Sequence, residues 1–126
     1  VVVCGYGHND MLYDGEKVVN AFKEDYAKFI EKFHTYYPNA KIVVMQTLKS
    51  NPVDDVEAAK FATRDAVFTA MNEEGYFDAD YVYYMQTDDI ELKYYDNLHP
   101  DEEDPEGHPK LTEYVIDFLK DNKIIK

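Results

Sequence analysis

Residues 41–47, Lys-Ile-Val-Val-Met-Gln-Thr, are the stretch that decides the fold class. Their apolar run has no polar side to turn toward water, which is typical of a strand in a sheet that is covered on both faces. The segments before and after it, residues 15–37 and 54–72, repeat apolar side chains every three or four positions and predict two amphipathic helices. Pro38 ends the first helix, and Pro52 lies in the loop that leads to the second.

The same alternation continues outward toward both ends of the chain. Residues 1–5, Val-Val-Val-Cys-Gly, and residues 80–85, Asp-Tyr-Val-Tyr-Tyr-Met, are predicted strands, and residues 108–122 are a predicted helix. A long polar loop over residues 86–107 separates the last strand from that helix. Strands that alternate with helices are joined by crossovers, which connect parallel strands. The sequence therefore predicts a single α/β domain with a parallel sheet.

Charge and composition exclude several classes of partner. The 126 residues include 26 acidic and 13 basic side chains, and the formal net charge of −13 repels nucleic acids and anionic membranes. No stretch approaches the roughly 20 apolar residues that a membrane-spanning helix needs. The single cysteine, Cys4, excludes an internal disulfide and a cysteine-based zinc site. One thiol is compatible with a cytoplasmic or a secreted protein, so the compartment stays open.

The loop over residues 86–107 contains the first candidate site, Asp96-Asn97-Leu98-His99-Pro100. A carboxylate three residues before a histidine can bind one ring nitrogen and fix the tautomer, so that the other nitrogen can act as a base. We interpret Asp96 and His99 as a catalytic pair. The alternative is an ordinary solvated histidine beside an acid. The six residues 101–106, Asp-Glu-Glu-Asp-Pro-Glu, would stabilise the protonated form of His99 if they faced it.

The second candidate site, Gly7-His8-Asn9-Asp10, directly follows the first predicted strand. The side-chain amide of Asn9 can donate a hydrogen bond to an oxyanion, whereas an Asx turn would be a purely structural role. We expect Asn9 and His99 to meet, because the carboxyl ends of parallel strands share one edge of the sheet. His8 either contacts substrate or fills the loop. A dinucleotide-binding loop is rejected, because Asp10 stands where such a loop needs its third glycine.

Together these two segments resemble the third and fifth sequence blocks of the SGNH (GDSL-type) hydrolases, G-x-N-D and D-x-x-H. Residues 29–42 are also similar to the helix-to-strand passage of bacterial carbohydrate acetyl esterases. The resemblance implies a three-layer αβα, flavodoxin-like domain and a serine esterase that hydrolyses small esters, with acetyl groups on carbohydrates as the expected substrate. It implies that His99 is the base, that Asp96 orients it and that Asn9 lies in the oxyanion hole. No cofactor is implied.

The family's G-D-S block, which carries the nucleophilic serine, is not in the sequence. Ser50 is the one serine and follows a predicted strand without a nucleophile motif, and Cys4 is expected to be buried and inert. We therefore expect residues 1–126 to be the C-terminal portion of a single SGNH domain, with its first strands and its serine upstream. Alone it should be inactive, and it should pair with that N-terminal segment or with a second copy of itself.

Two other interpretations remain open at this stage. The chain could be a degenerate, non-catalytic relative that binds an ester or has a structural role in a complex. A metal site built from Asp96, His99 and His108 is the weaker alternative, because these ligands have no recognisable spacing. We accordingly expect no metal.

Overall fold

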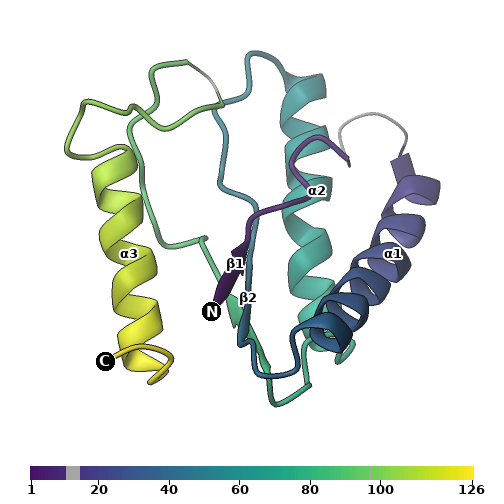
Figure 1. The fold of residues 1–126 in the computed structure, drawn as a ribbon. Coiled ribbons are helices and arrows are strands. Elements are labelled where there is room, and N and C mark those ends of the chain that lie inside the picture. Colours follow the sequence, from purple (N-terminus) through teal and green to yellow (C-terminus); the bar gives the residue numbers. More distant parts are fainter. Residues whose placement is uncertain (11–14, 97) are drawn as a thin grey trace.

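The computed structural model describes residues 1–10, 15–96 and 98–126. The elements follow in the order β1 (Val2–Cys4), α1 (Gly15–Tyr36), β2 (Ile42–Met45), α2 (Asp55–Glu73), β3 (Val82–Met85) and α3 (His108–Asp121) (Figure 1). The three predicted strands and three predicted helices are thus confirmed, with differences of a few residues at their ends.

The strands form one parallel sheet in the order β1-β2-β3. The register pairs Val3 with Val43 and Val43 with Tyr83 across neighbouring strands. This arrangement confirms the prediction of an α/β fold with a parallel sheet. Its consequence for function is that the loops after all three strands leave the sheet at the same edge.

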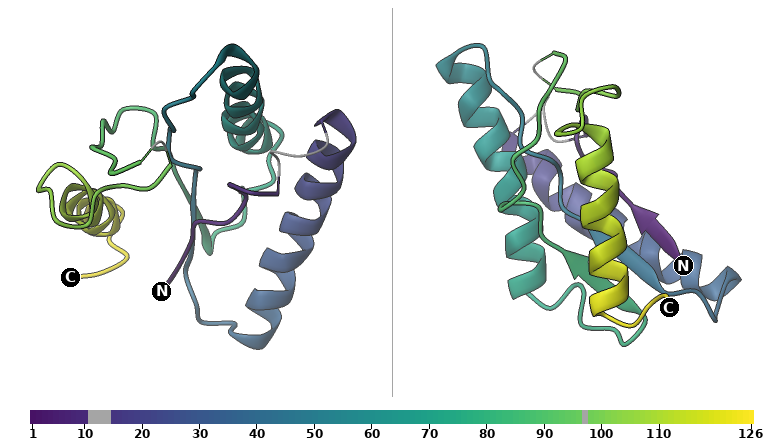
Figure 2. Two further views of the ribbon diagram at one scale, coloured as in Figure 1. Left: turned by 90° about the horizontal axis from the view of Figure 1, so that it is seen from above. Right: turned by 90° about the vertical axis from the view of Figure 1, so that its left-hand side faces the viewer.

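Helices cover both faces of the sheet, which explains the apolar run in β2. Figure 2 shows α1 and α2 on one side of the strands and α3 on the other. Ile42 and Val44 belong to the core under α1 and α2, whereas Val43 packs with Met85 and with Leu119 of α3. Because successive side chains of a strand point to opposite faces, both faces of β2 must be apolar.

The strands are shorter than the predicted runs. Residues 41–47 are predicted as strand, but β2 ends at Met45. Beyond it the Gln46 side chain accepts hydrogen bonds from the Tyr84 hydroxyl at 3.1 Å and from the Thr87 backbone N–H at 3.3 Å. The Gln46 backbone N–H still donates to the Met85 carbonyl at 3.0 Å, so backbone and side-chain hydrogen bonds together join the ends of β2 and β3.

The loop after β1 is fixed by Gly7, which lies at φ +112° in a region that favours glycine. A Cβ atom at this position would stand 2.7 Å from Phe22 Cζ and 3.1 Å from Phe68 Cζ. Helices α1 and α2 therefore press on the backbone of this loop. Glycine at position 7 lets the chain turn between them and sets the start of the His8-Asn9 segment.

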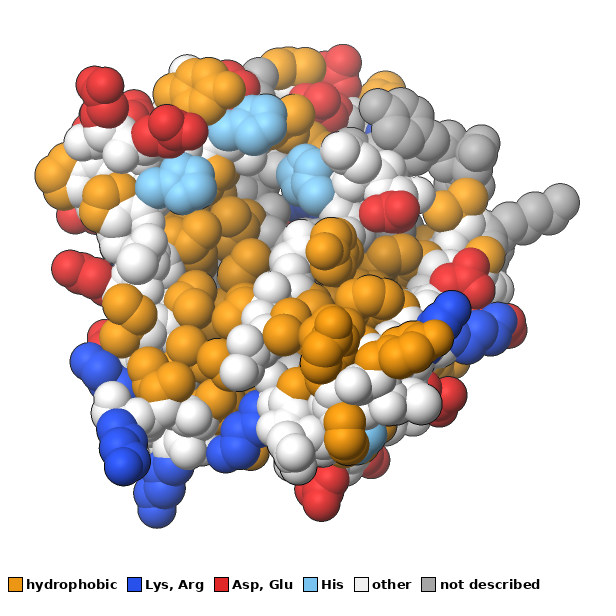
Figure 3. Space-filling model, in the orientation of Figure 1, with side chains coloured by type: hydrophobic (Ala, Val, Ile, Leu, Met, Phe, Trp, Pro, Cys, Tyr) orange, Lys and Arg blue, Asp and Glu red, His pale blue; other side chains and the backbone are white. Residues whose placement is uncertain are grey.

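Strand β1 lies at an edge of the sheet, and no strand of the described residues pairs with its outer side. Val3 is 38% exposed and Tyr6 is 62% exposed. Apolar side chains gather across the face of the molecule that Figure 3 shows, which is the side where β1 lies in front in Figure 1. Among the described helices, none is long and apolar enough to span a membrane.

Candidate functional site

Asp96 and His99 form a close pair in the loop before α3. Oδ2 of Asp96 lies 2.8 Å from Nδ1 of His99, and Oδ1 accepts the backbone N–H groups of Leu98 and His99, both at 2.7 Å. These hydrogen bonds, first that of the His99 ring and then those of the backbone, lower the pKa of Asp96 to about 2. The carboxylate is therefore ionised and holds the proton of His99 on Nδ1, which leaves Nε2 as the basic nitrogen.

Neighbouring residues hold this loop in place. The Tyr95 ring stacks on the His99 ring with centroids 5.7 Å apart, and the Tyr95 backbone N–H donates to the His99 carbonyl at 3.2 Å. Tyr94 forms an isolated antiparallel bridge with Pro100, and its hydroxyl donates to the carbonyl of Lys49. The pair is thus built on a short hairpin-like turn that is tied to the loop after β2.

The two predicted motif segments meet in one cleft of about 480 Å³ above the carboxyl ends of β1 and β2. The loops after β1 and β2 and the turn before α3 each contribute lining residues: Gly5, His8 and Asn9; Thr47 and Leu48; Leu98, His99 and Pro100. Asn9 and His99, predicted from separate motifs, therefore face a common space. Asp96 does not line the cleft and binds the far side of the His99 ring.

The sequence interpretation missed Arg64, which is the one arginine of the chain and is 0% exposed. It lies on α2, and its Nη1 is 2.8 Å from Nδ1 of His8 at the border of the cleft. A signal was present, because Arg64 follows the core residue Phe61 by three positions and precedes the core residue Met71 by seven. An arginine in an apolar helical stripe indicates a buried charge with assigned partners.

The other residues considered as nucleophiles lie away from this cleft. The half-buried Ser50 has its Oγ 3.5 Å from Nη1 of Arg64 and does not line the cleft. Cys4 is buried inside β1, and burial raises the pKa of its thiol, as expected for an inert cysteine. Among the described lining residues, none is a serine or a cysteine.

The acidic residues 101–106 do not gather around His99. Glu102, Glu103 and Glu106 are exposed, and Asp104 forms an ion pair with Lys93. Oδ1 of Asp101 accepts the backbone N–H groups of residues 103 and 104, at 3.0 and 3.1 Å. Glu106 forms an ion pair with Lys110 at 2.7 Å, so the acids with described partners bind the backbone of this segment, Lys93 or Lys110.

Gly107 closes this acidic segment. A Cβ atom there would lie 2.1 Å from the Asp101 carbonyl oxygen, so only glycine lets the backbone return to the start of α3.

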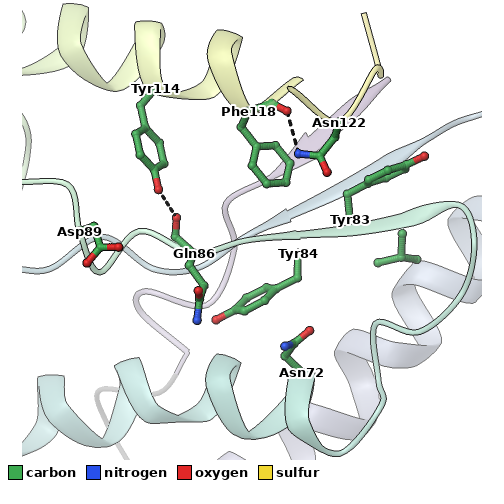
Figure 4. A pocket seen from close by; sticks show the side chains of 9 residues that line it. Asn72, Tyr83, Tyr84, Gln86, Asp89, Tyr114, Phe118 and Asn122 are labelled. Atoms are coloured by element: carbon green, nitrogen blue, oxygen red, sulfur yellow. Dashed lines mark hydrogen bonds between the residues drawn. The ribbon is translucent and has the colours of Figure 1, made fainter. Parts of the chain in front are cut away.

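A larger cleft of about 600 Å³ lies elsewhere, beside β3 and between α2 and α3 (Figure 4). Aromatic and amide side chains line it, and the Tyr114 hydroxyl donates to the Gln86 carbonyl at 2.8 Å. Neither Asp96 nor His99 belongs to it. In the part of the chain that is described, no three His, Cys, Asp or Glu side chains come close enough together to hold a metal ion, so the metal alternative gains no geometric support.

Comparison with protein-family models found no match, and no curated protein and no solved structure is significantly similar to the chain. Inference about function therefore starts from the residues of the cleft.

Proposed function

We propose that this chain provides the base and the oxyanion donor of an SGNH-type serine esterase that hydrolyses small esters. The observation that carries the proposal is that His99, already paired with Asp96, faces the same cleft as Asn9. Ester hydrolysis needs both a base beside the nucleophile and a donor for the oxyanion. The parallel sheet with helices on both faces fits the flavodoxin-like architecture of that family.

Each residue has a defined part in the proposed mechanism. Nε2 of His99 takes the proton of a serine as it attacks the ester carbonyl, and later returns that proton to the leaving alcohol. Asp96 holds Nδ1–H and stabilises the imidazolium that forms. The Asn9 amide donates to the oxyanion, a contribution that is typically worth about 3–4 kcal/mol of transition-state stabilisation. These steps require no cofactor.

The lining of the cleft supports an ester with an apolar acyl group. Met45, Leu48, Leu98 and Pro100 give the cleft an apolar lining, and its volume is about 480 Å³. The methyl group of an acetyl ester can contact these side chains, and the volume leaves room for the alcohol part of the substrate. A carbohydrate alcohol is supported by Tyr95, which stacks on His99 and is 64% exposed, because a free aromatic face can pack on a sugar ring.

The nucleophile has to come from outside these 126 residues, since their one serine binds Arg64 instead. We propose that it enters with a segment, or a second chain, that lies beside the exposed edge of β1. The lack of a nucleophile among the described residues of the cleft also supports a second candidate. This is a degenerate chain that binds esters without cleaving them.

Labelling of the intact protein with a fluorophosphonate, which reacts with activated serines, separates the two candidates. An esterase should be labelled at a serine within a Gly-Asp-Ser segment, and the matched His99→Ala variant should be labelled far more slowly. An intact protein with no labelled serine and no hydrolysis of p-nitrophenyl acetate would favour the binding function and contradict the esterase.

A further inference from the structure

Arg64 is a fully buried cation, and such a group is costly to desolvate unless its donors are paired. Nε donates to Oδ1 of Asp65 at 2.8 Å, and Nη2 lies 2.7 Å from the same oxygen in an ion pair. Nη2 also donates to the Leu48 carbonyl at 2.8 Å, which ties α2 to the loop after β2. Phe61 packs under the guanidinium, with 4.8 Å from its ring centroid to Cζ. The guanidinium is therefore held rigidly.

The remaining nitrogen, Nη1, faces the His8 ring. It lies 2.8 Å from Nδ1 and 3.4 Å from Nε2 of that ring, and 3.5 Å from Oγ of Ser50. The His8 ring also lies 6.3 Å from the Phe61 ring, measured between centroids. His8 is thus positioned from α2, although it belongs to the loop after β1 and lines the cleft.

This contact determines the protonation state of His8. A guanidinium stays charged and can only donate hydrogen bonds, so a second positive charge on the ring beside it is disfavoured. Both ring nitrogens lie close to Nη1, at 2.8 and 3.4 Å, so the contact opposes the protonated ring whichever nitrogen carries the proton of the neutral form. Burial, then the charge of Arg64 and then that of His99 lower the pKa of His8. Asp65 is the counter-charge on α2, and it contacts Arg64.

We propose that Arg64 is a positioning residue that holds His8 uncharged where it lines the cleft beside Asn9. The part that an uncharged His8 plays in catalysis rests on the proposed esterase function. An uncharged imidazole suits an uncharged ester substrate. It also spares His99 from a second positive charge when His99 becomes protonated during the reaction.

The test is a pH titration of the 126-residue chain by nitrogen-15 NMR of its imidazole rings, with the His8 signals assigned from a His8→Gln variant. We expect the His8 ring to show the nitrogen-15 signals of a neutral imidazole through pH 6.5, near the ordinary histidine pKa. A His8 ring that becomes protonated at the ordinary pH would overturn the proposal.

Variants at position 64 separate the effect of the Arg64 charge on His8 from the effect of the burial of His8. In Arg64→Met, and in Arg64→Gln should the first variant not fold, the titration midpoint of His8 should rise, because the positive charge that lowers its pKa is removed. Thr63→Met, at an exposed position on the same helix, is the matched control and should leave the His8 signals unchanged. An unchanged His8 spectrum in a folded Arg64 variant would contradict the proposal. If neither variant folds, the wild-type titration decides.

None of these measurements requires turnover. A neutral His8 in a protein without esterase activity would uphold the role of Arg64 and defeat the proposed function. An active esterase whose His8 titrates at the ordinary pH would uphold the proposed function and contradict the role of Arg64.

Discussion

Oδ2 of Asp96 lies 2.8 Å from Nδ1 of His99, while Oδ1 of the same carboxylate accepts two backbone N–H groups of the turn. One side chain therefore both shapes the loop and orients the imidazole. Loss of its charge should disturb both functions at once.

The pH dependence of this pair follows from the pKa of Asp96, which its hydrogen bonds lower to about 2 from an unfolded value of about 3.9. The unfolded chain binds more protons between these values, so the stabilisation is complete above about pH 4 and is lost as the pH falls toward 2. Carbon-13 NMR of the carboxyl groups should show Asp96 titrating near pH 2. In His99→Ala, which removes the largest cause, the pKa should rise. Titration of wild-type Asp96 at its ordinary value would contradict the observed hydrogen bonds.

Gly7→Ala should destabilise the protein by about 2–4 kcal/mol, because the new Cβ meets Phe22 and Phe68 at a positive φ. Gly5→Ala is the matched control. Its Cβ would meet only the flexible end of Met45, at 2.8 Å, so a smaller loss is expected. Urea unfolding of both variants measures the difference in the free energy of unfolding. Equal losses would mean that the loop conformation at Gly7 is not a constraint on folding.

The exposed edge of β1 should promote association, because an unpaired apolar strand can pair with another chain. We expect light scattering of the 126-residue chain to show a mass that rises with concentration, and Val3→Lys to suppress this rise. Val53→Lys, at an exposed position before α2, should have no such effect. A monodisperse monomer at high concentration would count against pairing at this edge.

The isolated chain should hydrolyse p-nitrophenyl acetate no faster than the uncatalysed background, since Ser50 does not line the cleft. Ser50→Ala should leave that rate unchanged. Turnover that Ser50→Ala abolishes would show that the nucleophile has been assigned wrongly.

Much of the fold could be predicted from the sequence because hydrophobic patterning is a local signal. The apolar run around Val43 predicted a strand covered on both faces, and the helices on either side of it were visible as apolar stripes. The hydrogen bonds that follow the end of β2 could not be predicted, because the Gln46 side chain accepts them from Tyr84 and Thr87 of another segment. Such tertiary contacts leave no periodic signal.

In the candidate site, as in the fold, some contacts could be predicted from the sequence and others could not. Asp96 and His99 are three residues apart, so their contact could be predicted from spacing. That Asn9 and His99 share one cleft followed from the rule for parallel sheets. The contact of Arg64 with His8 spans 56 positions and joins two elements through side chains alone, so no local pattern indicated it.

Steady-state kinetics with an acetyl ester, in a longer or reassembled protein that restores the serine which the proposed function requires, test whether His99, Asp96 and Asn9 hydrolyse esters. His99→Ala should remove nearly all turnover in a protein that still folds, and Asp96→Asn should come close to it because the tautomer is no longer fixed. Asn9→Ala should lower kcat by about 10²–10³-fold with a smaller change in KM, because the oxyanion exists only during the reaction. If His99→Ala kept wild-type turnover, or if Asn9→Ala raised KM and spared kcat, the assignment of these residues to ester hydrolysis would be wrong.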